Sequence, residues 1–345
     1  MHCTLLVPDL LSASPPDAAP YHELHLPALT RLLARGRCAS FDAVGMEAWL
    51  CQAFEIERRN DWPVAPLTLM IDGGDPGDAY WLRCDPVHLH MRRNQLILAA
   101  GGALTPSPQE SAALIATLNG HFATDGLSFL ACGPQRWYLR VERRPSISTH
   151  ALHDVIGRDI ECCLPSGPDS PRWHALINEI QMLLHAHPVN QAREARGEPA
   201  VNSIWLWGGG VKPTVQGRHF TEVWASDALA RALATFGQVP VHPLPANAVP
   251  LLAPEPGAPG RHLVVMPQLR DAVQYGDIAQ WRATLSMLER DWFSPLHEAL
   301  RRRRLSGLTL IAPGARRCLR CDITGGDLWK FWRPLRPLGV CRTWV

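Results

Sequence analysis

The sequence predicts an α/β core with a mainly parallel sheet flanked by helices, interrupted by an inserted α+β domain. Near both ends of the chain, short apolar runs alternate with helical patterns, as in a doubly wound sheet. From residue 79 to residue 141, short strand patterns follow one another closely. The alternation then returns at Val201. We therefore assign residues 1–72 and 199–345 to the core and residues 73–198 to the insertion.

The N-terminal part of the core contains three predicted elements. Thr4–Val7 is a short apolar run typical of a buried parallel strand. Leu26–Gly36 has helical apolar spacing and ends at a glycine. Pro66–Ile71 is predicted as a second strand that leads into a turn-rich segment.

The insertion combines short strands with two helices. The predicted helices are Pro108–Gly120 and Pro171–His185, and the second of them closes the insertion. The predicted strands are Ala79–Arg83, Gln95–Ala99, Leu127–Leu130 and Arg136–Val141.

The C-terminal part returns to the core. Pro240–Gly260 is rich in proline and alanine and is expected to be a long exposed connection. The predicted strands are Val201–Trp207, Leu263–Met266 and Leu308–Ile311, and the predicted helices are Asp227–Phe236 and Ile278–Leu300.

Composition excludes several classes of protein. A chain of 345 residues with 46% hydrophobic residues can bury two cores. The net charge of +2 does not indicate a nucleic-acid partner. The sequence shows no signal peptide and no apolar run long enough for a membrane helix, so we expect a cytoplasmic protein without a membrane role. In that setting the ten cysteines are expected to be reduced thiols.

Three consecutive glycines, Gly208, Gly209 and Gly210, end the strand that starts at Val201. Without side chains at these positions, backbone N–H groups could approach a phosphate closely. If this strand belongs to the core sheet, its carboxyl end lies where open α/β sheets bind ligands. The other interpretation is a tight turn after a buried strand.

The segment from His185 to Gly210 carries a family resemblance. Its characteristic residues are His187, Pro188, Asn190, Arg193, Gly197, Asn202, Trp205, Trp207 and Gly208. In this order they resemble cofactor-independent phosphoglycerate mutases of the archaeal type, a branch of the alkaline phosphatase superfamily. Leu118–Val141, Leu152–Asp169 and Trp224–Gly237 extend the resemblance. It implies an alkaline-phosphatase-like core with an inserted cap domain.

The resemblance also implies a catalytic centre of two divalent metals, held by Asp and His at the strand ends, and a serine nucleophile. Asp9 fits the first ligand position, although an Asp in a strand-to-loop turn needs no metal. The other matching positions differ from the family, because Gly45 stands at the nucleophile and Arg270, Gln274, Gly314 and Ala315 stand at ligands. Glycine has no nucleophile and arginine cannot bind a metal. A shifted alignment could instead supply Asp271 or Asp277.

The inserted domain retains the family's polar residues. His187, Asn190, Arg193 and Asn202 are candidate ligand-binding residues, together with Gly208, Gly209 and Gly210. The alternative is structural: Pro188 starts a short helix, Asn190 and Arg193 tie it to the sheet, and Asn202 bonds a loop.

Cys318 and Cys321 form a C-x-x-C pair that could contribute two thiolates to a structural zinc site. No second close pair follows, so ordinary reduced cysteines are the alternative.

Two functions from different classes follow. The first is a catalytically degenerate relative of the mutases, closest to the bacterial RpfE-type regulatory proteins, which needs no cofactor. Such a protein would regulate or scaffold, binding a phosphorylated small molecule or a protein partner. The second is an active metal-dependent mutase or phosphatase with two divalent ions (Mn, Mg or Zn). Its shifted ligands would come from Asp9, Asp271, Asp277, His262 or Asp322.

Overall fold

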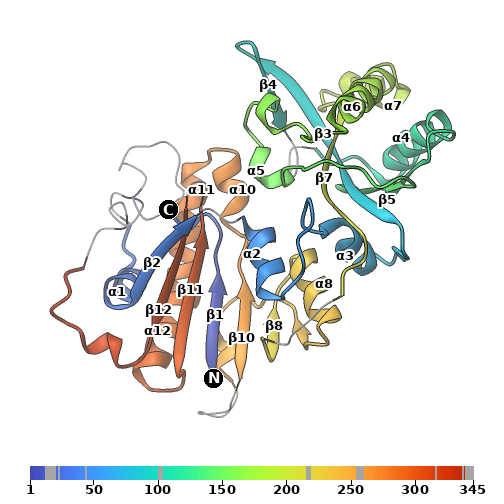
Figure 1. Ribbon diagram of the computed structural model, residues 1–345. Coiled ribbons are helices and arrows are strands. Elements are labelled where there is room, and N and C mark those ends of the chain that lie inside the picture. The colour runs from blue at the N-terminus through green and yellow to red at the C-terminus, as the bar shows by residue number, and fades with distance from the viewer. Residues whose placement is uncertain are drawn as a thin grey trace. The chain divides into compact units, whose positions relative to one another are not determined.

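The computed structural model divides into two compact units (Figure 1). The first comprises Met1–Glu55 and Val215–Val345, and the second comprises Ile56–Thr214. The second unit begins before residue 73 and ends after residue 198, the limits expected from the sequence. The structure describes residues 1–11, 21, 24–42, 45–99, 104–214, 219–253, 260–314, 317–335 and 338.

The first unit contains a seven-stranded, mainly parallel sheet, as the sequence predicts. Its central strand β1 pairs in parallel with β10 and β11, and β8 and β9 continue the parallel part. Among the described strands of this sheet, β12 runs antiparallel to both of its neighbours, β11 and β2. In spatial order the strands are β2 (Arg37–Asp42), β12 (Arg317–Ile323), β11 (Gly307–Pro313), β1 (His2–Leu6), β10 (Arg261–Val265), β8 (Glu222–Trp224) and β9 (Val241–His242).

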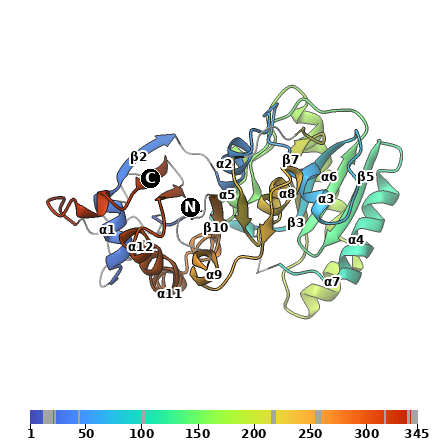
Figure 2. The same ribbon diagram turned by 90° about the horizontal axis from the view of Figure 1, so that it is seen from below.

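Side-chain alternation gives this sheet two apolar faces. Cys3 and Leu5 of β1 share one core cluster with residues of α1, α11 and α12, whereas the intervening Thr4 and Leu6 do not. These three helices group together in Figure 2. The helices of this unit are α1 (Pro27–Arg35), α2 (Met46–Ala53), α8 (Ala228–Phe236), α9 (Val249–Leu252), α10 (Arg270–Gln274), α11 (Ile278–Leu288), the π-helical turn η4 (Glu289–Phe293), α12 (Ser294–Arg301) and the 3₁₀ turn η5 (Asp327–Trp329).

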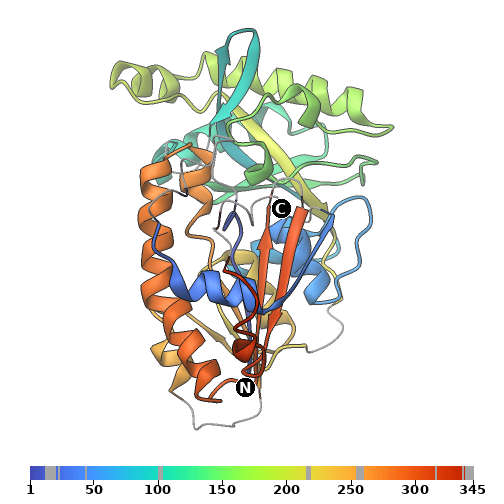
Figure 3. The same cartoon turned by 90° about the vertical axis from the view of Figure 1, so that its left-hand side faces the viewer.

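The predicted helix Ile278–Leu300 is one helical rod with a π-turn in its middle (orange in Figure 3). That turn contains Glu289, a buried residue whose carboxylate accepts hydrogen bonds from Ala28 N–H (2.6 Å) and Leu29 N–H (3.0 Å). Leu26, the N-cap residue of α1, has no side-chain acceptor. Glu289 therefore supplies a cap that the local sequence of α1 lacks.

The second unit contains a five-stranded antiparallel sheet in which the long strand β3 is central. The first part of β3 pairs with β6, its middle with β7 and its last part with β4. The strands are β3 (Tyr80–Arg92), β4 (Gln95–Ala99), β5 (Leu127–Gly133), β6 (Arg136–Val141) and β7 (Ser203–Gly210).

The predicted strand Val201–Trp207 was assigned to the core sheet, and this assignment is wrong. Its observed counterpart β7 pairs with β3 from Val87 to Trp81, and not with any described strand of the sheet that contains β1. A run of apolar residues identifies a buried strand but not its partner. Consequently, and contrary to our expectation, Gly208–Gly210 do not end a strand of the core sheet.

Helices cover this second sheet. Apolar residues of α4, α6 and the strands form one core, while Ala65 and Leu69 of α3 form a second cluster with Trp81 and Tyr138. The helices are α3 (Val64–Ile71), α4 (Pro108–His121), α5 (Leu152–Val155), the 3₁₀ turn η3 (Glu161–Cys163), α6 (Ser170–His185) and α7 (Pro188–Ala195).

Two further local predictions are wrong. Pro66–Ile71 is not a strand but most of α3, because a short apolar run buried on all sides fits either structure. The segment predicted as an exposed connection from Pro240 contains β9 and α9, and Ala248 and Leu251 are fully buried there. Residues 254–259 of that segment lie outside the described residues.

Cys38 of β2 and Cys321 of β12 form a disulfide. The expectation that all ten cysteines are reduced is therefore wrong for this pair, which lies directly opposite in the register of the two strands. Within the described residues, no helix combines the length and the apolar character that crossing a membrane requires.

Candidate functional site

The carboxyl end of β10 carries a buried ion pair. After the strand, the chain turns into α10, whose first residue is Arg270, and Glu47 lies in the first turn of α2. Arg270 Nη1 donates to Glu47 Oε1 at 2.9 Å and Nη2 donates to Oε2 at 3.4 Å. Each side chain is 8% exposed. Two desolvated charges are tolerated here because they bond each other on both carboxylate oxygens.

Two more carboxylates act on this arginine. Asp9 follows β1, and Asp227 follows β8 and caps α8 by accepting from Ala230 N–H at 2.9 Å. Burial disfavours the charge of Arg270, but Glu47, Asp9 and Asp227 outweigh burial and hold its pKa above the ordinary value. Burial raises the pKa of Asp227, and the nearby Glu47 raises it further. The positive charge of Arg270 is thus a fixed part of the structure and lies near three carboxylates.

The residues at these strand ends do not fit a divalent metal. Both oxygens of Glu47 are used by Arg270, and the guanidinium repels a second cation from Asp9 and Asp227. Among the described residues, no three His, Cys, Asp or Glu side chains converge in a way that could hold a metal ion. Asp9 itself has a left-handed backbone (φ 61°), and its N–H donates to Pro313 O, as a residue in a strand-to-loop turn does.

Among the described residues, the positions proposed for shifted ligands do not form a metal-binding cluster with Asp9. Asp271 is exposed on α10, and Asp277 is the exposed N-cap of α11, accepting from Gln280 N–H at 2.8 Å. His262 lies near the amino end of β10, opposite the end that leads to Arg270, and is close to Glu222. Asp322 on β12 is bound by Arg320 and Thr309.

Gly45, at the expected nucleophile position, is the N-cap residue of α2, where its carbonyl accepts from Trp49 N–H. Gly314 donates its N–H to Arg317 O in the β11–β12 turn. Ala315 lies outside the described residues.

The three glycines of β7 are packed closely against other parts of the second unit. A Cβ on Gly208 would lie 2.9 Å from Val64 Cβ, and one on Gly210 would lie 2.5 Å from Pro63 Cβ. A Cβ on Gly209 would overlap Tyr80 Oη and lie 2.7 Å from Leu82. All three glycines are buried. Their small size is required by the start of α3 and by β3, so an open backbone for a phosphate, our expectation, is wrong.

The side-chain carboxylate of Asp61 occupies the position at the glycines where we had considered a bound phosphate. Asp61 is 6% exposed and accepts hydrogen bonds from Thr149 N–H (2.9 Å), Thr149 Oγ1 (2.5 Å) and the backbone N–H of Gly209. Burial raises the pKa of Asp61, and these three hydrogen bonds oppose the rise. The glycine-rich strand end thus binds the chain's own acid.

His187 and Asn190 are bonded within the second unit. His187 caps α7, its Nδ1 accepting from Val189 N–H at 3.2 Å, and its Nε2 lies 3.0 Å from Thr117 Oγ1. Burial lowers the pKa of His187. The buried Asn190 donates to Leu184 O and Val201 O and accepts from Val201 N–H.

Arg193 and Asn202 have structural partners too. The buried Arg193 donates to Pro199 O at 2.9 Å and to Glu110 Oε2 at 2.8 Å. Asn202 bonds Leu89 on both sides, accepting from its N–H at 2.7 Å and donating to its carbonyl at 2.8 Å. Together with His187 and Asn190, these residues join α7 and the start of β7 to their neighbours.

The C-x-x-C pair cannot form the candidate zinc site. Cys318 and Cys321 lie three residues apart within β12, so their side chains point to opposite faces of the sheet. Cys321 is bonded to Cys38 instead.

Sequence reasoning missed a second buried ion pair, in the second unit. Arg83 donates to Asp85 Oδ1 through Nη2 (2.6 Å) and Nε (3.0 Å), and Asp85 Oδ2 accepts from Trp207 Nε1 at 2.8 Å. The Arg83 guanidinium lies 5.2 Å from the ring centres of Tyr138 and Trp207. The alternation of charged residues in the apolar strand YWLRCD was the available signal. Glu47 and Asp227 were missed as well, and no motif marks them.

Known proteins similar to this chain are phosphoglycerate mutases. The chain is 34% identical over 109 residues to the 2,3-bisphosphoglycerate-independent phosphoglycerate mutase of Methanosarcina barkeri, covering 31% of this chain and 27% of that protein. It is 30% identical over 159 residues to a Geobacter sulfurreducens protein named "Probable 2,3-bisphosphoglycerate-independent phosphoglycerate mutase", covering 46% and 39%. The matches thus span well under half the length of these relatives. No family model matches the chain.

The fold has a counterpart among solved structures. The PH0037 protein from Pyrococcus horikoshii aligns with a TM-score of 0.53 at 12% identity, covering 94% of this chain and 87% of that one. The cofactor-independent phosphoglycerate mutase from Thermoplasma acidophilum aligns with a TM-score of 0.49 at 13% identity, covering 98% and 94%. The chain is therefore similar in sequence to phosphoglycerate mutases over part of its length, and its α/β fold has a counterpart in the PH0037 protein.

Proposed function

We propose that this chain is a catalytically inactive relative of the cofactor-independent phosphoglycerate mutases, of the RpfE-type regulatory kind, and acts as a regulatory or scaffold protein. The observation that carries the proposal is the buried Arg270–Glu47 pair at the end of β10. A phosphoryl transfer that depends on two metals needs anionic ligands there, and Arg270 provides a fixed positive charge instead.

The nucleophile position supports the same proposal. Gly45 starts α2 without a hydroxyl or thiol, and nearby Cys51 is fully buried in that helix. Burial raises the pKa of the Cys51 thiol well above its ordinary value, so this group does not ionise at neutral pH. Neither residue supplies an activated nucleophile.

We take the class of ligand to be tested from the names of the relatives. Since those relatives are named as phosphoglycerate mutases, a phosphorylated carboxylic acid is the small molecule to test, and a protein partner is the alternative effector. We assign no phosphate contact to Gly208–Gly210, because they pack against α3 and β3.

The test combines metal content with turnover. The full chain is equilibrated with manganese, magnesium or zinc, desalted, analysed for bound metal, and assayed for interconversion of 2- and 3-phosphoglycerate. We expect substoichiometric metal and a rate equal to that of buffer. Metal-dependent turnover that disappears in Asp9→Ala would show that the chain is an enzyme.

Calorimetry with 3-phosphoglycerate, and with inorganic phosphate as its control, then tests the ligand. Saturable binding by the metal-free protein would support a metabolite-sensing role. Absence of binding would leave the protein partner as the effector.

A further inference from the structure

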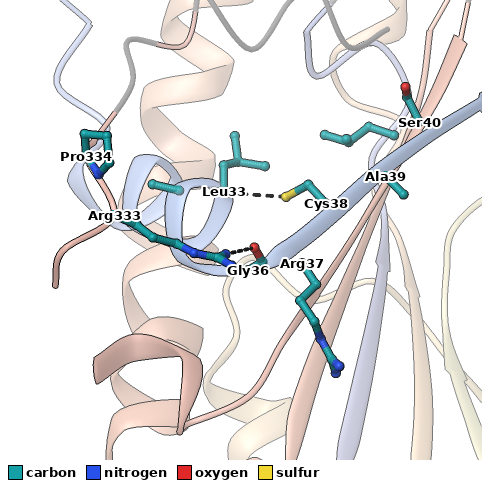
Figure 4. Close-up of a pocket in the computed structure, with 10 residues that line it drawn as sticks. Leu33, Gly36, Arg37, Cys38, Ala39, Ser40, Arg333 and Pro334 are labelled. Carbon is teal, nitrogen blue, oxygen red and sulfur yellow. Dashed lines mark hydrogen bonds between the residues drawn. The ribbon is translucent and has the colours of Figure 1, made fainter. Parts of the chain in front are cut away.

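A cavity of about 410 Å³ lies in the first unit beside the disulfide (Figure 4). Its volume is in the range of sites that hold small molecules. The end of α1, the start of β2, one residue of β12 and the segment after η5 form its wall. Its lining includes Leu33, Gly36, Arg37, Cys38 and Arg333.

The two sulfurs of the disulfide differ in access. Cys38 is half-buried and lines the cavity, whereas Cys321 is 0% exposed and does not line it. Of the two bonded cysteines, a thiolate that enters the cavity therefore reaches Cys38. Exchange at a disulfide depends on which sulfur can be attacked, so the geometry selects Cys38 as the attacked atom and Cys321 as the leaving group.

The charge of the wall favours an anion. The charge comes from Arg333, because Arg37 points to the opposite face of β2 from Cys38 (Figure 4). Arg333 Nη1 donates to Gly36 O at 2.8 Å, as Figure 4 shows, which fixes the guanidinium at the wall. The described residues that line the cavity include Arg333 and no acid.

The released thiols have acceptors already in place. Cys38 Sγ lies 3.3 Å from Leu33 O, and Cys321 Sγ lies 3.9 Å from Leu32 O. The bonded sulfurs carry no proton, so these contacts become hydrogen bonds only after reduction. Each released thiol therefore has a backbone carbonyl near it that can accept a hydrogen bond.

We propose that this cavity binds a small anionic thiol, the chemical class of glutathione, and that this thiol exchanges with Cys38. The incoming thiolate bonds to Cys38 Sγ, the Cys38–Cys321 bond breaks, and Cys321 leaves as a thiolate that takes up a proton. A second thiolate then attacks the sulfur of the bound small molecule, releasing reduced Cys38 and the oxidised dimer of the small thiol. The proposal does not depend on the mutase-related function.

The exchange acts on an edge of the sheet. β2 is the outermost strand, paired with β12, and the disulfide fastens it covalently. Reduction leaves β2 held by backbone hydrogen bonds and a few side chains, since its side chains are mostly exposed. Hydrogen exchange in β2 should therefore rise on reduction, while exchange in the central strand β1 should not.

The experiment uses the full chain and peptide mass spectrometry. Brief treatment with reduced glutathione, quenched by acid, should give a glutathione adduct on Cys38 and none on Cys321. Arg333→Gln should slow the reaction with glutathione about fivefold and leave that with the neutral 2-mercaptoethanol unchanged. Arg290→Gln, which removes an exposed arginine outside the cavity, is the matched control and should change neither rate.

Three results would overturn the proposal. One is an adduct on Cys321, which would mean that the buried sulfur is the accessible one. Another is an equal effect of Arg333→Gln on both thiols, because that would exclude charge recognition. The third is the absence of the Cys38–Cys321 bond after air oxidation of the purified protein.

Discussion

Arg270 decides the chemistry of the strand ends. Its guanidinium is nearly as buried as a core leucine, yet it remains charged because Glu47 bonds it and Asp9 and Asp227 lie in its field. Removing one partner of such a pair costs much more than the pair contributes, since the remaining charge is left desolvated. The position therefore tolerates neither loss of its charge nor addition of a metal.

We expect Arg270→Met to lower the free energy of unfolding by about 3–5 kcal/mol, because Glu47 is left as an uncompensated buried charge. The double variant Arg270→Met with Glu47→Leu should recover part of this loss. Urea unfolding measures both. Arg290→Met, at an exposed pair, is the control and should change stability by less than about 0.5 kcal/mol. A double variant as unstable as the single one would contradict the account.

His187 gives the second unit a specific response to acid. Its Nδ1 must be unprotonated to accept from Val189 N–H, and burial lowers its pKa below 6.5. The unfolded chain therefore takes up the proton first as pH falls. The contribution of His187 is complete above pH 6.5 and is lost as pH falls from there to the lower pKa of the folded state.

We expect His187→Asn to flatten this part of the stability profile, because an asparagine caps a helix without titrating. Unfolding by urea at several pH values between 5 and 8, compared with wild type, measures the difference. His219→Asn, at an exposed pair with Glu55, is the control. An unchanged slope in His187→Asn would mean that another group causes the response.

At the scale of elements, β7 is defined by what packs against its glycines. Gly209→Ala should destabilise the protein by about 1–3 kcal/mol, because the new methyl group meets Tyr80 and Leu82. Gly120→Ala is the matched control, since nothing lies within 4 Å of its added carbon in α4 and alanine favours a helix. Thermal unfolding should place the two variants on opposite sides of wild type.

Most elements could be predicted from the sequence because periodicity and end signals are local. Arg136–Val141 is a strand at the predicted limits, and Asp227 caps α8 where the helix was expected to start. The failures have a common cause. α3 and β7 are almost entirely apolar, so neither their type nor their partner is encoded within the segment.

For the same reason, the candidate site could be predicted from the sequence only in part. Loss of the family's nucleophile at Gly45 and of ligands at Arg270 could be read position by position. The pairing of Arg270 with Glu47, 223 positions away, could not, because it requires the sheet to bring both elements together. The disulfide between β2 and β12 was missed for that reason as well.

At the scale of the whole molecule, the boundaries of the second unit can be tested by expression of fragments. Residues 56–214 include β7 and both apolar clusters, so this fragment should fold alone and unfold cooperatively in urea. The matched fragment 73–198, which follows the limits suggested by the sequence, lacks α3 and β7 and should not fold. β7 covers β3 from Trp81 to Val87, so its loss opens the centre of that sheet. Equal circular dichroism and cooperativity of the two fragments would contradict this division.

The place of β1 in the sheet has a consequence for biosynthesis. Leu6 pairs with Val265 of β10 and Ile311 of β11, so the central strand is translated long before either neighbour. At the usual rates of about 5–20 residues per second, a ribosome needs roughly 13–50 s to reach β10 after completing β1. Throughout that interval, the apolar strand has no partner, while the whole of Ile56–Thr214 emerges and can fold. The nascent chain therefore presents to holding chaperones a strand that will later become the centre of the finished sheet.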